Sequence, residues 1–190
     1  MQATLPTAKN NKKKHIMKNI ILIIIITTSI LSCKKTHDLF TFDVKDSSSF
    51  TIEAKYGVDL PFSIPTPDVT TSSETEFKNN NTKASLVKEI ILKKLTLTIT
   101  SPSGQTFKFL KNITLYISAD GEKEIELAKK ENIDNNVGTS IDLDPTSAFL
   151  DVYVKKDKYK LRTQVTTDEV LLHDVDVKVD LTFQVTAKGA

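Results

Sequence analysis

The last part of the chain carries the clearest hydrophobic pattern. In residues 174–186, DVDVKVDLTFQVT, apolar and polar side chains alternate, and the apolar set is Val175, Val177, Val179, Leu181, Phe183 and Val185. Successive side chains of a strand point to opposite faces of a sheet, so this period of two predicts a strand with one buried and one wet face. Such alternation is typical of antiparallel sheets, because parallel strands covered on both faces are continuously apolar.

The same alternation marks shorter segments along the chain. They lie at 39–44, 50–52, 95–100, 113–117 and 159–165. Turn signals separate several of them: SPSG at 101–104, ADGE at 119–122 and DNNVG at 134–138, where Pro presets φ and Gly accepts positive φ. Many short strands separated by turns predict a mainly β fold, an antiparallel β-sandwich that is immunoglobulin-like or similar.

Two segments have a different pattern. SLVKEIILKK at 85–94 places Leu86, Ile90 and Ile91 at helical spacing, and EKEIELAKKE at 122–131 is rich in helix-forming residues. We therefore expect one or two short helices that pack on the sandwich. A strand is the alternative for each segment.

Residues 56–84 contain Pro61, Pro65 and Pro67, followed by a polar run with three consecutive asparagines. Proline cannot donate a hydrogen bond to a strand ladder, so it is confined to the edges of sheets. This region predicts an extended loop with one edge strand at 74–77.

The N-terminal part of the chain is apolar over residues 20–32, IILIIIITTSILS, directly after the lysine-containing KKKHIMKN. A stretch of 13 residues is short of the roughly 20 that a transmembrane helix needs. A cleaved signal peptide has a positive segment, an apolar segment and a small residue at the cleavage site. We assign residues 1–32 to such a signal peptide. Met17 is a second candidate start of translation.

The signal peptide ends in ILSC at 30–33, which contains the only cysteine of the chain. This sequence resembles the lipobox of bacterial lipoproteins, although that family prefers Leu where Ile30 stands and a smaller residue in place of Leu31. The resemblance implies cleavage by signal peptidase II between Ser32 and Cys33, a diacylglycerol thioether on Cys33, and acylation of the new amine. No other cofactor is expected.

Other roles for Cys33 fit its surroundings less well. A free cysteine is usually a buried core residue, but the polar KKTHD follows this one. A disulfide has no second cysteine in the chain. A catalytic thiol needs a base, and although His37 is four residues away, both lie at the end of a leader.

Three regions follow from these assignments. Residues 1–32 are the signal peptide, 33–47 the lipidated N-terminus and tether, and 48–190 the sandwich domain. Lys34 and Lys35 follow the cysteine, and the absence of Asp at the second position resembles lipoproteins sorted to the outer membrane. We expect the periplasmic face of that membrane, since no acidic export run follows Cys33.

Charge limits the partners of this protein. Residues 1–32 hold five lysines and no acid, so the remainder carries 21 basic against 24 acidic residues. Nucleic-acid binding needs a basic patch with arginine or aromatic contacts to bases, and the chain after the leader has a single arginine, Arg162. We therefore exclude nucleic acid and expect the membrane, through the lipid, and an envelope protein or ligand as partners.

The catalytic motifs HExxH, CxxC, GxSxG and the phosphate-binding loop are all missing from the sequence. His173 and Asp174 are adjacent on a predicted strand and point to opposite faces, which disfavours a catalytic pair. The carboxylates of Asp174, Asp176 and Asp180 are typical of a wet strand face. Calcium binding by Asp134, Asp142 and Asp144 is a weaker alternative, because the calcium-loop spacing is missing.

The sequence thus predicts a lipid-anchored, non-enzymatic binding or structural module of the bacterial cell envelope, without catalytic residues or a metal. The alternative is a surface glycan-binding accessory protein or a hydrolase with a site built from loops. The scarcity of tyrosine and the absence of tryptophan disfavour sugar stacking.

Overall fold

The computed structural model describes residues 38–190, and most of these residues lie in strands. The elements are β1 (Leu39–Ile52), β2 (Phe62–Pro65), β3 (Val69–Thr70), α2 (Ser73–Asn79), η1 (Ala84–Leu86), β4 (Val87–Ser101), η2 (Phe107–Phe109), β5 (Leu110–Ser118), β6 (Ile125–Lys130), β7 (Ser140–Pro145), α3 (Asp151–Val154), β8 (Lys158–Thr167) and β9 (Val175–Lys188). All strand pairs are antiparallel. The prediction of a mainly β, antiparallel fold is confirmed.

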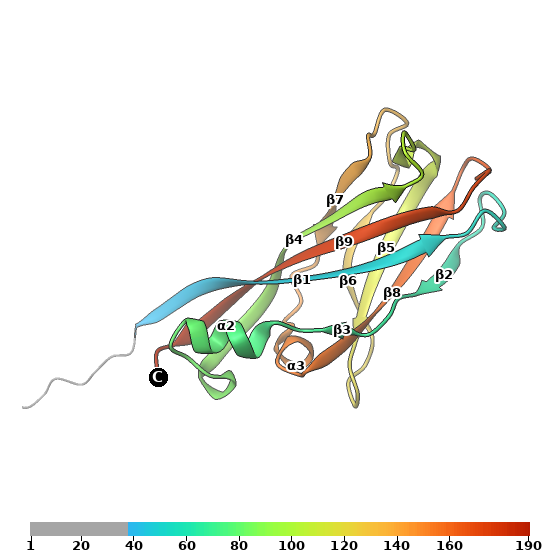
Figure 1. The fold of residues 1–190 in the computed structure, drawn as a ribbon. Helices are drawn as coiled ribbons and strands as arrows, with labels where there is room; N and C mark the ends of the chain where they lie inside the picture. Colours follow the sequence, from blue (N-terminus) through green and yellow to red (C-terminus); the bar gives the residue numbers. More distant parts are fainter. Residues whose placement is uncertain (1–37) are drawn as a thin grey trace, which may run out of the picture. The chain divides into compact units, whose positions relative to one another are not determined.

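The strands form one sheet that curls into a sandwich-like arrangement, with the order β1-β9-β4-β7-β6-β5-β8-β2 and β3 paired to β8. Strand β7 joins the two layers, because its first residues pair with β4 and its last two pair with β6. Figure 1 shows β1, β9 and β4 in front of β5, β6 and β8. The core lies between these layers.

Strand β9 lies between β1 and β4, and its alternation is as predicted. The six apolar side chains on its inner face are at most 1% exposed. Across the core, the ring of Tyr159 on β8 meets that of Phe183 edge-on, with 6.0 Å between their centroids. The hydrophobic faces of both layers therefore pack directly on each other.

The domain begins earlier than the sequence indicated. Residues 39–47, which we assigned to a tether, form the first half of β1 and pair with β9, from Leu39 opposite Lys188 to Ser47 opposite Asp180. The buried side chains of Val44 and Asp46 lie in this half. The boundary of the sandwich therefore lies at 38–39 and not at 48.

Both segments predicted as helices are strands. Residues 85–94 lie largely in β4, where the register shifts between Val87 and Glu89 and again between Leu92 and Lys94. A bulge inserts one extra residue into a strand, so the spacing of buried residues grows locally from two to three. Ile90 is therefore the next buried residue after Val87, and a spacing of three residues is also typical of a helix.

The segment 122–131 forms β6, and its bulge has the same consequence. The register shift leaves Leu127 unpaired between Glu126 and Ala128, and both Leu127 and Ala128 are fully buried. Two consecutive buried residues conceal the period of two.

The helices lie elsewhere, at 73–79 and 151–154. The edge strand expected at 74–77 is therefore wrong, and the edge strands of this region are β2 and β3. Lys78 Nζ lies 2.7 Å from Glu74 Oε1 across one helical turn, and Phe77 packs its ring edge-on against Phe42 of β1. In residues 38–190, neither helix has the length and apolar composition needed to cross a membrane.

Candidate functional site

Of the residues that the sequence singled out, Ser32, Cys33 and His37 lie outside the described residues 38–190. His173 and Asp174, expected on a strand, lie in the loop before β9, and His173 is exposed. The neighbouring Asp174 accepts a hydrogen bond from the backbone N–H of Ala54, 2.8 Å away, and so fastens the chain after β1. Its carboxylate has a structural role at the end of the sheet.

The acids of β9 lie on the wet face, as predicted. Asp176 accepts a hydrogen bond from the hydroxyl of Thr51 on β1 at 2.7 Å. Asp180 pairs with Lys178 at 2.8 Å on its own strand. Cross-strand and same-face pairs of this kind stabilise a sheet.

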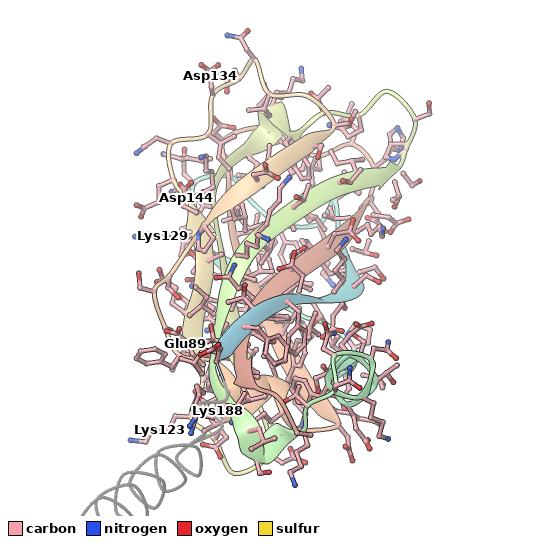
Figure 2. The ribbon with its side chains drawn as sticks, turned by 90° about the vertical axis from the view of Figure 1, so that its left-hand side faces the viewer. Glu89, Lys123, Lys129, Asp134, Asp144 and Lys188 are labelled. Atoms are coloured by element: carbon pink, nitrogen blue, oxygen red, sulfur yellow. The ribbon has the colours of Figure 1, made fainter. Side chains whose placement is uncertain are left out.

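The three acids considered for calcium do not form a cluster. Asp142 accepts a hydrogen bond from Thr96, which lowers the pKa of its carboxyl group, and it also pairs with Lys94. Figure 2 shows Asp134 on a loop at one end of the molecule and Asp144 further along on β7. Within residues 38–190, no three His, Cys, Asp or Glu side chains are arranged to hold a metal ion.

A cavity of the described part lies between α2, the turn after it, and the end of α3, with a volume of about 570 Å³. Pockets of 300–1,000 Å³ are typical of small-molecule sites. Its walls combine hydroxyls, lysines, two acids and two apolar residues. They are Thr70, Thr71, Ser73, Glu74, Thr75, Phe77, Lys78, Thr82, Lys83, Ala84, Lys155, Lys156 and Asp157.

A buried carboxylate attaches α2 to the sandwich. Asp46 on β1 is 8% exposed. Its Oδ1 accepts hydrogen bonds from the backbone N–H and the hydroxyl of Ser72, both at 2.9 Å, and its Oδ2 accepts one from the hydroxyl of Tyr159 at 3.0 Å. Burial, with the adjacent Asp46 carboxylate, raises the pKa of Tyr159 far above its ordinary value. The three donors satisfy the buried carboxylate and fix the residue before the helix.

The other end of α2 is fixed to the C-terminus. Asn81 adopts a left-handed conformation with φ of 50°, which asparagine tolerates, and its carbonyl accepts a hydrogen bond from the N–H of Ala190 at 2.8 Å. The hydroxyl of Thr82 donates to the carbonyl of Lys188 at 2.6 Å. The turn carrying Lys83 and Ala84 therefore lies beside the end of β9, at the same end of the sandwich as the start of β1 (Figure 1).

The lysines of α2 and its turn differ in their partners. Lys78 pairs with Glu74, and this hydrogen bond holds the pKa of Glu74 below its ordinary value. Lys83 is exposed and has no ion pair or side-chain hydrogen bond within residues 38–190. Its charge is therefore available to a ligand.

The opposite wall is held by α3. Lys155 lies 3.6 Å from Asp151, and Lys156 lies 3.4 Å from Glu122 in the turn before β6. The hydroxyl of Tyr153 donates to the carbonyl of Lys123 at 2.8 Å, which fastens α3 to the same turn. These lysines are less exposed than Lys78, so this wall has the more fixed geometry.

Two surface tyrosines, Tyr116 and Tyr56, have their rings covered by a neighbour, whereas Phe149 is 66% exposed. The guanidinium of Arg162 covers the ring of Tyr116 at 4.1 Å, and it also binds Glu124 through two nitrogens. Tyr56 stacks on Phe62 with centroids 3.8 Å apart. Sugar binding commonly uses a free aromatic face, and both of these rings already have a partner.

The cavity has no signature in the sequence. Its residues come from 70–84 and 155–157, which are far apart in the chain and are brought together by the pairing of β3 with β8 and the hydrogen bond from Thr71 N–H to the carbonyl of Asp157. The Glu74–Lys78 spacing is the one local signal that could have revealed α2, because opposite charges four residues apart favour a helix.

Comparison with known proteins does not assign this chain to a family. No family model matches it, and no curated protein matches. A solved structure from Desmodium yellow mottle tymovirus aligns with 9% sequence identity over 80% of this chain and 90% of that chain, with a TM-score of 0.23. This score is too low to relate the two proteins in fold or function.

Proposed function

We propose that this protein is a lipid-anchored module of the bacterial cell envelope that acts by binding and not by catalysis. The lipobox-like ILSC at 30–33, at the end of an apolar leader, carries this proposal. Two or three acyl chains on Cys33 would hold the domain stably at a membrane, whereas one chain binds only marginally.

The proposed anchor would lie close to one particular end of the domain. Only five residues separate Cys33 from Leu39, the first residue of β1. A fully extended chain spans at most about 3.6 Å per residue, so the start of β1 would lie within about 20 Å of the lipidated cysteine. The cavity lies at that end of the sandwich, since its Thr82 is bonded to Lys188, which pairs with Leu39.

Anchoring explains how such a module would act. A tether confines the domain to one surface and raises its effective concentration toward any partner on that surface. The side chains of Asp142, Asp174 and Asp176 are each hydrogen-bonded to a neighbouring strand or loop, which is a structural role.

The test is metabolic labelling of the full chain in a bacterial host with radioactive palmitate. We expect the wild type to be labelled, to fractionate with membranes and to begin at Cys33 by mass spectrometry. The Cys33→Ser variant should be unlabelled. A Lys35→Ser variant, which keeps the lipobox-like sequence, is the matched control and should be labelled as the wild type is.

Two outcomes would contradict the proposal: an unlabelled wild type, or a mature N-terminus other than Cys33. Location is tested separately on the same cells. We expect the protein in the outer-membrane fraction and protected from protease added to intact cells, because Lys34 and Lys35 replace an acidic export run.

A further inference from the structure

The walls of the α2–α3 cavity have a chemistry that differs from the rest of the domain. Residues 38–190 contain 19 of the 26 basic residues and all 24 acidic residues, so the domain has a net charge of −5. The lining of the cavity has four lysines and two acids. Lys78, Lys155 and Lys156 are paired with Glu74, Asp151 and Glu122, so the unpaired positive charge of the lining is that of Lys83, which favours an anionic ligand.

The hydrogen-bond donors of the cavity add to this charge. Ser73 is only 2% exposed, and its hydroxyl forms no hydrogen bond within the described part of the chain. The hydroxyls of Thr70 and Thr75 are likewise free of side-chain partners there. Together with the ammonium of Lys83, these groups can donate to several oxygens of one ligand.

The size of the cavity and its apolar wall indicate more than a bare anion. About 570 Å³ exceeds what a single phosphate fills, and the exposed Ala84 supplies apolar surface beside the lysines, whereas Phe77 is only 3% exposed. We propose that the cavity binds a phosphate ester, with its phosphate at Lys83, Lys78 and the hydroxyls and its organic part against Ala84. Lysine is a common phosphate ligand, acting as a point charge.

Two sources can supply such an ester: the headgroup of a membrane phospholipid, or a soluble phosphate ester. The lipid source rests on the proposed anchoring, because the anchor would hold the cavity near the bilayer. The phosphate chemistry itself rests on the cavity alone.

The experiment measures how fast each lysine of the full chain, purified in a neutral detergent, reacts with an acylating reagent. Glycerol 3-phosphate is titrated, with glycerol as the uncharged control, and modification is read residue by residue by mass spectrometry. We expect glycerol 3-phosphate to slow the modification of Lys83 and Lys78, and glycerol to leave it unchanged. Lys123 should be unaffected in both titrations.

Charge reversal then tests the assignment. Lys83→Glu should weaken the apparent affinity for glycerol 3-phosphate by about tenfold or more, since a favourable contact becomes a repulsive one. Lys123→Glu is the matched control, because Lys123 is also exposed, lies in the turn beside α3 (Figure 2), and is not part of the lining. Its affinity should remain that of the wild type.

A second titration identifies the source. The full chain is reconstituted in nanodiscs of phosphatidylcholine with or without phosphatidic acid. Protection of Lys83 by phosphatidic acid supports the lipid source, and protection by glycerol 3-phosphate alone supports a soluble ester. Absence of protection in both media, or equal loss in both charge-reversal variants, would overturn the proposal. If the wild-type chain carries no lipid but glycerol 3-phosphate still protects Lys83, the phosphate site is supported and only the proposed lipid anchor is rejected.

Discussion

One end of the sandwich has a buried carboxylate beside a cavity, and the other has loops with exposed aliphatic side chains, although Leu39 and Val152 are also exposed at the first end. At the end with α2 and α3, a carboxylate is buried with three donors, and lysines and hydroxyls surround a cavity. At the other end, the loop 53–61 is held to the last residue of β8 by a hydrogen bond from Asp59 N–H to the carbonyl of Thr167, and the loop 168–174 begins there. There four aliphatic side chains are exposed: Val58, Leu60, Val170 and Leu172.

This difference shows where side-chain chemistry determines stability. A buried polar group must keep its partners, because losing one leaves a desolvated group unsatisfied. An exposed apolar side chain contributes little to folding, but a group of them gives a surface that favours association. Substitutions at the first end should therefore change stability, and substitutions at the second should change the surface.

The largest effect is expected for Asp46→Ala. The substitution leaves the hydroxyl of Tyr159 and the backbone N–H of Ser72 without their acceptor, at a cost of about 3 kcal/mol, whereas the hydroxyl of Ser72 keeps the carbonyl of Lys45 at 3.0 Å. The free energy of unfolding, from urea denaturation, measures this loss. Hydrogen exchange should accelerate in α2 and remain unchanged in the loops at the opposite end.

Asp43→Ala is the control for this prediction. Asp43 lies on the same strand, but its carboxylate pairs with Lys93 on the surface. Exposed pairs of this kind contribute at most about 1 kcal/mol. Equal losses in both variants would show that Asp46 is not the group that fastens α2.

Tyr159→Phe removes one of the three donors and should cost about 1.5 kcal/mol at neutral pH. The pKa of Tyr159 is raised in the folded state from an ordinary value of 10.0. The folded state therefore favours the protonated phenol. Its contribution to the free energy of unfolding is complete below about pH 10, and above that pH it falls by about 1.4 kcal/mol per pH unit.

The raised pKa also predicts how the difference in free energy of unfolding between the wild type and Tyr159→Phe changes with pH. The wild type should be the more stable protein at neutral pH, and the gap should close near pH 11, at about 1 unit above the ordinary tyrosine pKa. Urea denaturation of both proteins at each pH measures the gap. A gap that is constant up to pH 11 would mean that the phenol of Tyr159 ionises freely in the folded protein.

The sequence predicted the fold class well because most strands keep a strict period of two. It failed where a bulge interrupts that period, as at Lys88 and Lys93 in β4 and Leu127 in β6. A bulge depends on the partner strand, so the local sequence cannot reveal it. The alternation at 39–44 predicted the start of β1, but the strand continues through 45–47, where the polar Asp46 is buried because Ser72 and Tyr159 meet it.

The candidate site was less accessible to prediction than the fold. The lysines of the cavity come from α2, the following turn and the end of α3, and each is surrounded by ordinary polar sequence. Only the pairing of β1 with β9 and of β3 with β8 brings these segments together. Long-range strand pairing leaves no trace at any one position, so a single sequence does not identify the site.

The smallest effect on stability is expected at the far end, for the double variant with Leu60→Ser and Leu172→Ser. These side chains are 67% and 83% exposed, so the free energy of unfolding should change by less than about 0.5 kcal/mol. Retention on a hydrophobic column and binding of a hydrophobic dye should both fall, because the exposed apolar surface is reduced.

Leu171→Ser tests whether exposure of the side chain is the reason why the double variant should keep its free energy of unfolding. Leu171 is adjacent to Leu172 in the same loop but only 8% exposed, and burying a hydroxyl in its place should cost about 2 kcal/mol or more. If the double variant lost as much stability as Leu171→Ser, the far-end side chains would have to be packed against the domain. The loops 53–61 and 168–174 would then be part of the core, and the contrast between the buried Asp46 at one end and these exposed loop side chains at the other would fail.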